Sequence, residues 1–191
     1  TITGGALDVS GTNYGITAKS WTDTGAGTFT EGGGTVTFDV AGGTINSNEA
    51  FYNVTVNHAG TSTVGANLEV SNILTITSGT LDASSYTITL SGTTGTPFSN
   101  SGTFTASTST VSYTGNNSGG NTNITNVIYN NLTINNGSET YVLTAALDVN
   151  DTVTITAGAL DVSGTNYGIT AKSWTDTGAG TFTEGGGTVT F

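Results

Sequence analysis

The first 38 residues of this chain return at its end. Residues 1–38 and 154–191 differ at a single position, where Gly4 is replaced by Ala157, so the sequence carries a repeat of about 153 residues. A single globular domain gives no reason for a chain to begin and end in the same phase of one motif. We therefore expect a segment of a longer tandem array that continues beyond both ends.

A weaker repeat lies inside the first one. FYNVTVN at 51–57 aligns with YNNLTIN at 129–135, and the stretch that begins at Asn67 aligns with the one that begins at Ala146. The half-unit is thus about 75–78 residues long. We predict that 1–50 is the C-terminal part of one half-repeat, 51–128 a complete half-repeat and 129–191 the start of the next.

Within a half-unit, short segments such as NLTIN, TVTIT and GTVTF alternate apolar residues with Thr or another small polar residue. This period of two is typical of half-buried strands, and the Gly, Asn, Asp and Ser between the segments favour tight turns. No stretch has helical spacing over ten residues. We expect an all-β chain.

Two architectures fit this pattern: a parallel, right-handed β-solenoid with coils of roughly 20 residues, or a row of tandem β-sandwich domains. The scarcity of large core residues favours the thin interior of the solenoid. Asn doublets such as Asn130–Asn131 suit corners where amides stack from coil to coil. On this hypothesis one 153-residue repeat makes seven or eight coils and rises by about 35 Å.

The charge balance narrows the range of partners. Only 8% of residues are charged, and 13 acidic residues against two Lys and no Arg give a net charge of −11. Nothing here could neutralise phosphates, so nucleic acid is not an expected partner. There is no Cys, and no apolar stretch is long enough to span a bilayer.

Two longer strings carry a resemblance. NLTINNGSETYVLTAALDVNDTVTITAGALDVSG (131–164) and ILTITSGTLDASSYTITLSG (73–92) resemble the β-strand repeats of large bacterial and archaeal extracellular surface proteins, including adhesins and autotransporter-like passengers. The resemblance covers nearly the whole chain. It implies a right-handed β-solenoid, an extracellular or cell-surface location, and a role in filaments, attachment or matrix. It carries no shared active-site motif, so it implies no functional residue.

Candidate catalytic groups are few. A glycosidase needs two converging carboxylates, and Asp148 and Asp151 are the closest pair in sequence, but LDVND indicates a strand followed by a turn with solvated acids. His58 is the only His, and we interpret it as a turn residue. We predict that the chain is not an enzyme and assign it no catalytic, cofactor-binding or metal-ligating residues.

Calcium binding stays open as an alternative to a chain without cofactors. The sequence lacks the EF-hand loop and the calcium-binding nonapeptide. The closest stretches place Asp23 with Glu31 and, in the second copy, Asp176 with Glu184, near Gly-rich turns.

Carbohydrate binding is a second alternative. Trp21 beside Lys19, and Trp174 beside Lys172, could stack on a sugar ring. The competing interpretation is that these Trp side chains cover the edge of the core or pack against a neighbouring fibre.

Thr triplets also recur, as TIT at Thr1, Thr75, Thr87 and Thr154 and as TFT elsewhere. A face that binds ice needs hydroxyl rows at constant spacing, and the gaps between these triplets vary widely. We therefore interpret them as outward-facing residues of ordinary strands.

The sequence as a whole predicts a structural component of an extracellular fibre, surface filament or adhesin shaft. The alternative is a carbohydrate- or calcium-binding repeat module of a cell-surface adhesin. We expect self-association along or between fibres, through Thr-rich faces or Tyr14, Trp21 and Phe29, and cell-surface glycans as a second kind of partner.

Overall fold

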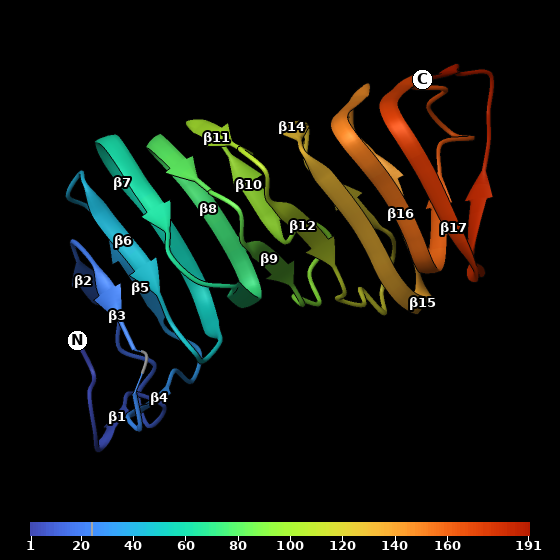
Figure 1. The fold of residues 1–191 in the computed structure, drawn as a ribbon. Helices are drawn as coiled ribbons and strands as arrows, with labels where there is room; N and C mark the ends of the chain where they lie inside the picture. The colour runs from blue at the N-terminus through green and yellow to red at the C-terminus, as the bar shows by residue number, and fades with distance from the viewer. Residues whose placement is uncertain (24) are drawn as a thin grey trace.

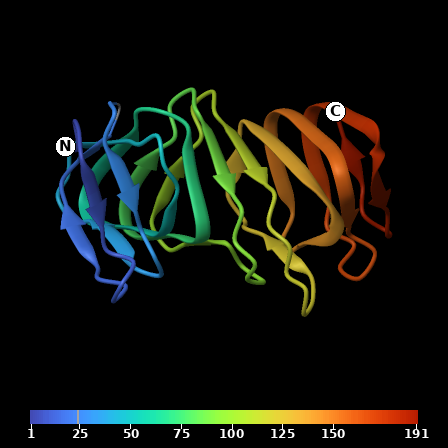
Figure 2. The ribbon, with the colours of Figure 1, turned by 90° about the horizontal axis from the view of Figure 1, so that it is seen from below.

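The computed structural model describes residues 1–23 and 25–191, and within these ranges all regular structure is β-strand. The strands form a parallel β-solenoid of about 9 turns, with the two termini at opposite ends of the stack (Figures 1 and 2). The prediction of an all-β parallel solenoid is confirmed, and the alternative of tandem sandwiches is not adopted. The described residues contain no helix of the length and hydrophobicity needed to cross a bilayer.

The strands have the following bounds: β1 (Ala6–Asp8), β2 (Ile16–Ala18), β3 (Trp21–Thr22), β4 (Thr28–Thr30), β5 (Thr35–Phe38), β6 (Gly43–Asn46), β7 (Phe51–Val64), β8 (Leu68–Asp82), β9 (Thr87–Leu90), β10 (Phe98–Asn100), β11 (Thr103–Thr105), β12 (Thr110–Tyr113), β13 (Thr122–Ile124), β14 (Ile128–Tyr129), β15 (Asn131–Leu143), β16 (Leu147–Asp161), β17 (Ile169–Thr183) and β18 (Val189–Thr190).

Each coil pairs with the next one in parallel, so partners are one coil apart in sequence. Val36 of β5 faces Val54 of β7 at the short extreme, and Leu74 of β8 faces Phe98 of β10 at the long one. Coil length therefore varies while strand register is kept. Loops outside the strands, such as the one that contains Pro97, absorb the difference in length.

The longest strands bend around corners of the solenoid. In β7 and β8 the pairing shifts register on either side of Asn57, and in β15 and β16 it shifts around Asn135. Such irregularities let one strand cross from one face of the coil to the next without losing its partner. As a result, a segment of 14 or 15 residues contributes to two faces of the same coil.

Alternation places every second side chain inside, where identical positions of successive coils stack in columns. One inner column runs through β9, β12, β15, β16 and β17 as Ile88, Val111, Leu132, Val153 and Trp174. The four aliphatic members are buried, since each has a coil on both sides. The thin core is thus built from small branched side chains, as the composition predicts.

Aromatic clusters interrupt this aliphatic core once per half-unit. Trp21 contacts Phe29 and Phe51, with ring centroids 4.7 and 5.2 Å apart. The next half-unit repeats the arrangement with Phe104 between Phe98 and Tyr129, at centroid distances of 5.4 and 6.4 Å. Each cluster joins two neighbouring coils through aromatic packing.

Asn side chains clamp the corners between coils, as the sequence predicts. The backbone N–H and the side-chain amide of Asn53 both donate to the carbonyl of Gly34, each over 3.2 Å. Asn131 repeats this double contact to the carbonyl of Ser109, at 3.0 and 3.3 Å. Asn72 adds a direct amide-to-amide bond of 2.8 Å to Asn53. These bonds satisfy carbonyls that the turns would leave without partners.

Candidate functional site

Trp21, one of the two residues considered for sugar stacking, lies inside the solenoid. Its side chain is only 6% exposed within the aromatic cluster, so its faces are not open to a ligand. Trp174 is half-buried and packs edge-on against Phe182 at a centroid distance of 4.9 Å. The interpretation of Trp21 as a core residue is confirmed, and only Trp174 keeps a partly open ring.

Aromatic contacts between fibres were expected from Tyr14, Trp21 and Phe29, and the structure corrects two of these three. Trp21 and Phe29 are both buried, because the coil that carries Phe51 covers them. Tyr14 is 66% exposed at a turn of the first coil. Of the three, only Tyr14 has a ring that is exposed to solvent.

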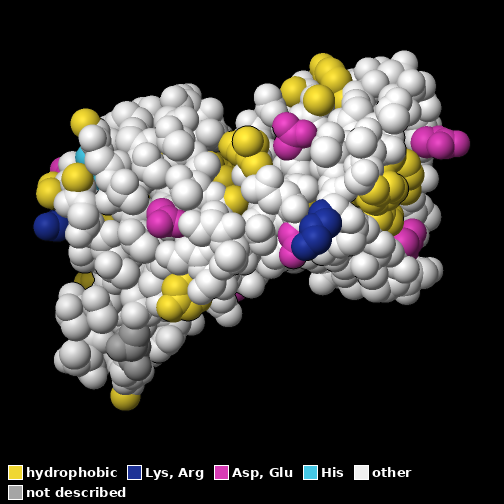
Figure 3. All heavy atoms as spheres, turned by 45° about the horizontal axis from the view of Figure 1, so that its top comes forward, with side chains coloured by type: hydrophobic (Ala, Val, Ile, Leu, Met, Phe, Trp, Pro, Cys, Tyr) yellow, Lys and Arg dark blue, Asp and Glu magenta, His cyan; other side chains and the backbone are white. Residues whose placement is uncertain are grey.

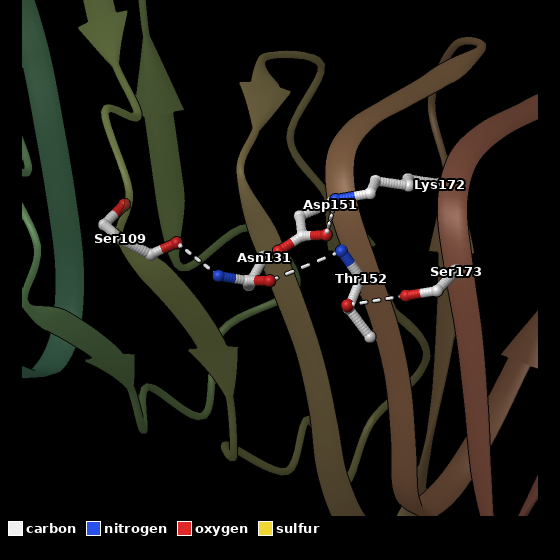
Figure 4. Close-up of polar contacts among 6 residues, drawn as sticks. All are labelled: Ser109, Asn131, Asp151, Thr152, Lys172 and Ser173. Atoms are coloured by element: carbon white, nitrogen blue, oxygen red, sulfur yellow. Dashed lines mark hydrogen bonds and ion pairs between the residues drawn. The ribbon is translucent and has the colours of Figure 1, made fainter.

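Asp148 and Asp151 both lie on β16, on the outside of the coil. Asp151 forms an ion pair with Lys172 of β17, with 3.3 Å between Oδ1 and Nζ (Figure 4). Asp148 is exposed and stands beside Ile128 and Thr170 in the strand register. These are the surroundings of surface acids on a strand, and one of the two is paired with a Lys of the next coil.

His58 is not an exposed turn residue, as the sequence suggested, but is buried within β7. Its Nδ1 accepts a hydrogen bond of 3.0 Å from the backbone N–H of Gly60. The proton of the neutral ring is therefore on Nε2, which donates to the hydroxyl of Ser62 over 2.8 Å. A His that donates to a Ser cannot take that hydroxyl's proton, so the pair is arranged for structure.

Outward hydroxyls form columns along the solenoid axis. Thr89, Ser112, Thr133, Thr154 and Thr175 face one another in the register of successive coils. The uneven spacing of Thr along the chain does not prevent even spacing in the fold, because loops absorb the differences. That premise of the sequence analysis is wrong, although the interpretation as outward strand residues is confirmed.

A second column stands two residues earlier on the same strands. Its members Asn131, Thr152 and Ser173 are linked from coil to coil, with Oγ of Thr152 and Ser173 2.7 Å apart (Figure 4). In the first column, none of the five hydroxyls bonds to another described residue of the protein. The face of the molecule drawn in Figure 3 is mainly uncharged, with acidic and basic side chains scattered over it. This face is wet and polar but carries little charge.

Three buried tyrosines close a polar network inside the solenoid. The hydroxyl of Tyr113 accepts from the backbone N–H of Thr125 and lies 2.9 Å from the hydroxyl of Tyr129, which donates to the carbonyl of Thr125. Tyr141 donates to the carbonyl of Gly115 over 2.9 Å. Burial raises the pKa of both Tyr113 and Tyr129, so these hydroxyls stay protonated and act as structural donors.

The acids considered for calcium do not pair as the sequence suggested. The carboxyl group of Asp23 meets that of Glu49 from the next coil, and Glu31 lies near Glu69 and Ser71. Contact with Asp23 is the main cause that raises the pKa of Glu49 above its ordinary value. In the second copy, Asp176 is exposed and accepts the backbone N–H of Gly178 over 3.0 Å. We call Asp23, Ser47 and Glu49 the acidic corner.

Sequence reasoning missed Glu49 because it lies one coil away from Asp23. Within residues 1–23 and 25–191, no group of three or more His, Cys, Asp or Glu side chains gathers in a way that could hold a metal ion. The acidic corner is therefore a pair of carboxyl groups, to which any further ligand would be a hydroxyl, a carbonyl or water.

Comparisons with known proteins add no functional information. No protein-family model matches the chain, and no match was found among curated proteins or solved structures. The chain's own architecture is therefore the basis on which a function is proposed.

Proposed function

We propose that this chain is part of the shaft of an extracellular fibre, surface filament or adhesin, and that its function is mechanical. The observation that carries the proposal is the return of the same sequence, in the same strand register, at both ends of one uninterrupted stack. Ile2 stands beside Asp23 in the first copy, and Ile155 stands beside Asp176 in the second. A unit that repeats in phase lengthens the rod without changing its cross-section.

Backbone hydrogen bonding along the axis supports a stiff rod. Sixteen of the strands belong to one continuous parallel network, and the aromatic clusters and Asn corners add side-chain links between coils. Stretching such a rod requires the breaking of hydrogen bonds that run parallel to the applied force. Stacking also covers the strand edges that would otherwise pair with other chains.

The sides of the rod suit a role at the cell surface or in a matrix. The outward hydroxyl columns and the net charge of −11 keep the surface hydrated. Self-association between shafts is the expected interaction, with the exposed Tyr14, Val40 and Ile128 as apolar points on an otherwise polar surface. Cell-surface glycans remain the alternative partner, and Trp174 is accessible to them only in the last coil, because a further coil would cover it as the coil of Phe51 covers Trp21.

The experiment that tests the proposal varies the number of repeats. Chains with one, two and three copies of the 153-residue unit should form rods of constant width whose length grows by about 35 Å per copy, since each copy adds seven or eight coils. Small-angle X-ray scattering gives the length and the cross-section separately. Electron microscopy of the three-copy chain checks that the rod is unbranched.

A length that does not increase in equal steps, or a scattering profile of separate beads, would contradict the shaft. A glycan array on the same chains tests the alternative function. Binding that is lost in Trp174→Ala would favour a carbohydrate-binding module, and the matched variant Tyr14→Ala controls for the loss of an exposed ring.

A further inference from the structure

The acidic corner contains a carboxyl group that is expensive to bury. Asp23 is 0% exposed, and neither of its side-chain oxygens has a hydrogen-bond partner among residues 1–23 and 25–191. Its backbone is held in the stack, because its N–H donates to the carbonyl of Asn46 over 2.8 Å. An ionised carboxylate without a partner costs several kcal/mol to bury, so this group needs a compensating charge or proton.

Glu49 brings a second carboxyl group to the same place. Its backbone N–H donates to the hydroxyl of Ser47, which itself is buried in the corner beside Asp23. This bond fixes the turn that directs Glu49 towards Asp23. The Oε2 atom of Glu49 is also buried without a partner in the described part of the chain. Three carboxylate oxygens are thus buried without a donor among the described residues, and the two carboxyl groups contact each other.

A hollow of about 170 Å³ opens to solvent on the Ser47 and Glu49 side of this corner, and Asp23 lies behind these two residues and does not line it. Glu49 and Ser47 line it together with Glu69, and the other polar lining residues are Asn48, Asn67 and Thr89. All of these side chains carry oxygen, and none of the lining residues is basic. The hydroxyl of Ser91 donates to Oε1 of Glu69 over 3.0 Å, which holds that carboxylate at the rim. The hollow is therefore an oxygen-lined approach from solvent to Glu49 that contains no basic group.

The neighbouring half-unit offers a natural comparison. Asn100 stands beside Ile76 in the strand register, as Asp23 stands beside Ile2, so it occupies the equivalent inward position. The sequence alignment of the half-units places Val127 where Glu49 lies in the first. Both acids are replaced by neutral residues together, while the aromatic cluster beside them is kept. The oxygen of Asn100 is also buried without a partner in the described part of the chain, so the joint replacement removes the two charges but not the unsatisfied oxygen.

We propose that Asp23 and Glu49 bind a divalent cation of the Ca²⁺ type, which links two successive coils of the solenoid. A single shared proton can satisfy one contact between the two groups and leaves the remaining oxygens without partners. Ca²⁺ takes six to eight oxygen ligands in flexible geometry, and two carboxylates balance its charge. The hydroxyl of Ser47 and water in the hollow are available to complete the shell. Mg²⁺ is disfavoured, because it demands a stricter octahedral geometry.

Calcium titration of the metal-free chain tests this proposal directly. Ca²⁺ should raise the midpoint of thermal unfolding in a saturable manner, and Mg²⁺ at the same concentration should have a smaller effect. Asp23→Asn and Glu49→Gln should each weaken Ca²⁺ affinity at least about tenfold, since each removes a direct ligand. Both variants are expected to fold, because each removes an uncompensated buried charge.

Asp176→Asn is the matched control. It changes the same residue in the second copy, where the side chain is exposed, and it should leave calcium affinity unchanged. Tb³⁺ bound in place of Ca²⁺ provides a second readout. Trp21 lies two residues from Asp23 and can sensitise the luminescence of the bound Tb³⁺. The signal should be lost in Trp21→Phe and retained in Trp174→Phe.

Two results would overturn the proposal. One is the absence of any saturable effect of Ca²⁺ or Tb³⁺ on the parent chain, which would leave Asp23 and Glu49 as two carboxyl groups that share a proton. The other is a calcium effect that persists unchanged in both Asp23→Asn and Glu49→Gln. The test is independent of the shaft proposal, since rod length and cation binding are measured separately.

Discussion

Residues 1–38 and 154–191 have almost the same sequence, but they bury different apolar side chains. The first copy buries those of its later residues, and the second copy buries those of its earlier residues. Leu7 is 37% exposed and its counterpart Leu160 is 0% exposed, whereas Phe38 is 0% exposed and its counterpart Phe191 is 74% exposed. In the first copy the early residues lie in the outermost coil, which has a neighbour on one side only. In the second copy the late residues lie in the last coil of the stack. Burial of a side chain is therefore decided by the coils above and below it.

Two turns, by contrast, keep the same local hydrogen bonds in both copies. Asn13 and Asn166 both have positive φ, at 54° and 55°, and the side-chain oxygen of each accepts the backbone N–H of a Gly in the next coil. Asp8 and Asp161 both accept the backbone N–H and the hydroxyl of the Ser two residues later. What the two copies share is set by turns within the segment, and what differs depends on neighbouring coils.

The largest expected difference between the copies concerns the two Trp residues. Trp21→Ala should destabilise its coils by about 3–5 kcal/mol, because it removes a buried ring from an aromatic cluster. Trp174→Ala should cost only about 1 kcal/mol, because that ring is half-exposed, packs on Phe182 and has a neighbouring coil on one side only, where it stands beside Val153. Guanidinium unfolding followed by hydrogen exchange of the surrounding strands measures both effects.

A chain extended after Phe191 by a copy of residues 39–64 supplies the control. The added coil brings the counterpart of Phe51 over Trp174, so Trp174→Ala should become as costly as Trp21→Ala. Equal costs in the original chain, without the extension, would show that burial in this fold does not depend on the neighbouring coil.

A smaller effect, equal in the two copies, is expected from the Asn turns. In Asn13→Ala and Asn166→Ala, an Ala without a side-chain hydrogen bond has to adopt positive φ, and one hydrogen bond to the next coil is lost. Each should cost about 2 kcal/mol locally. The measurement is the loss of hydrogen-exchange protection at the amides of Gly33 and Gly186.

Substitution by Gly separates the two contributions to this cost. Asn13→Gly and Asn166→Gly adopt positive φ without strain and lose only the hydrogen bond. Each should therefore destabilise the chain by about half as much as the corresponding Ala variant. A clear inequality between the copies would mean that the end coil, and not the turn, determines the result.

The smallest effect concerns acid titration. Hydrogen bonds from Ser10 and Ser163 lower the pKa of Asp8 and Asp161 below the ordinary value. A lowered pKa means that the stabilisation is present above the pKa of the unfolded chain and is lost as pH falls through the folded pKa. Carboxyl ¹³C titration by NMR should find both pKa values lowered, and Ser10→Ala and Ser163→Ala should raise each part of the way to normal, because the backbone N–H still donates to the carboxylate. A shift in one copy only would contradict the shared local geometry.

Much of this architecture follows from the sequence because its causes are periodic. The alternation of Thr with Val, Ile and Leu fixes which side of each strand is inside, and the doublet Asn130–Asn131 predicts a corner where Asn131 links two coils, whereas the equivalent link at Asn53 was not predicted. The even spacing of the hydroxyl columns could not be predicted. The coils differ in length, and the sequence does not show which residues of each coil lie in loops and which in strands. Burial of Trp21 likewise depends on Phe51, which is in the next coil.

The candidate site was less accessible to sequence reasoning than the fold. Glu31 is closer to Asp23 along the chain than Glu49 is, but strand pairing brings Ser47 and Glu49 to Asp23 and leaves Glu31 beside Glu69. Only the comparison of Asp23 with Asn100, once the register is known, identifies the pair as a feature of one half-unit.

The sequence by itself determined that this chain is all-β, that it repeats in phase after about 153 residues, and that its turns are made by Asn, Asp, Ser and Gly. Each of these can be read directly from the order of the residues along the chain. Only the tertiary structure decided which coil covers which side chain, and thus which Trp is buried and which carboxyl groups meet. Contacts of that kind join residues one coil apart, and coil length varies along the chain, so they follow from the stacking register.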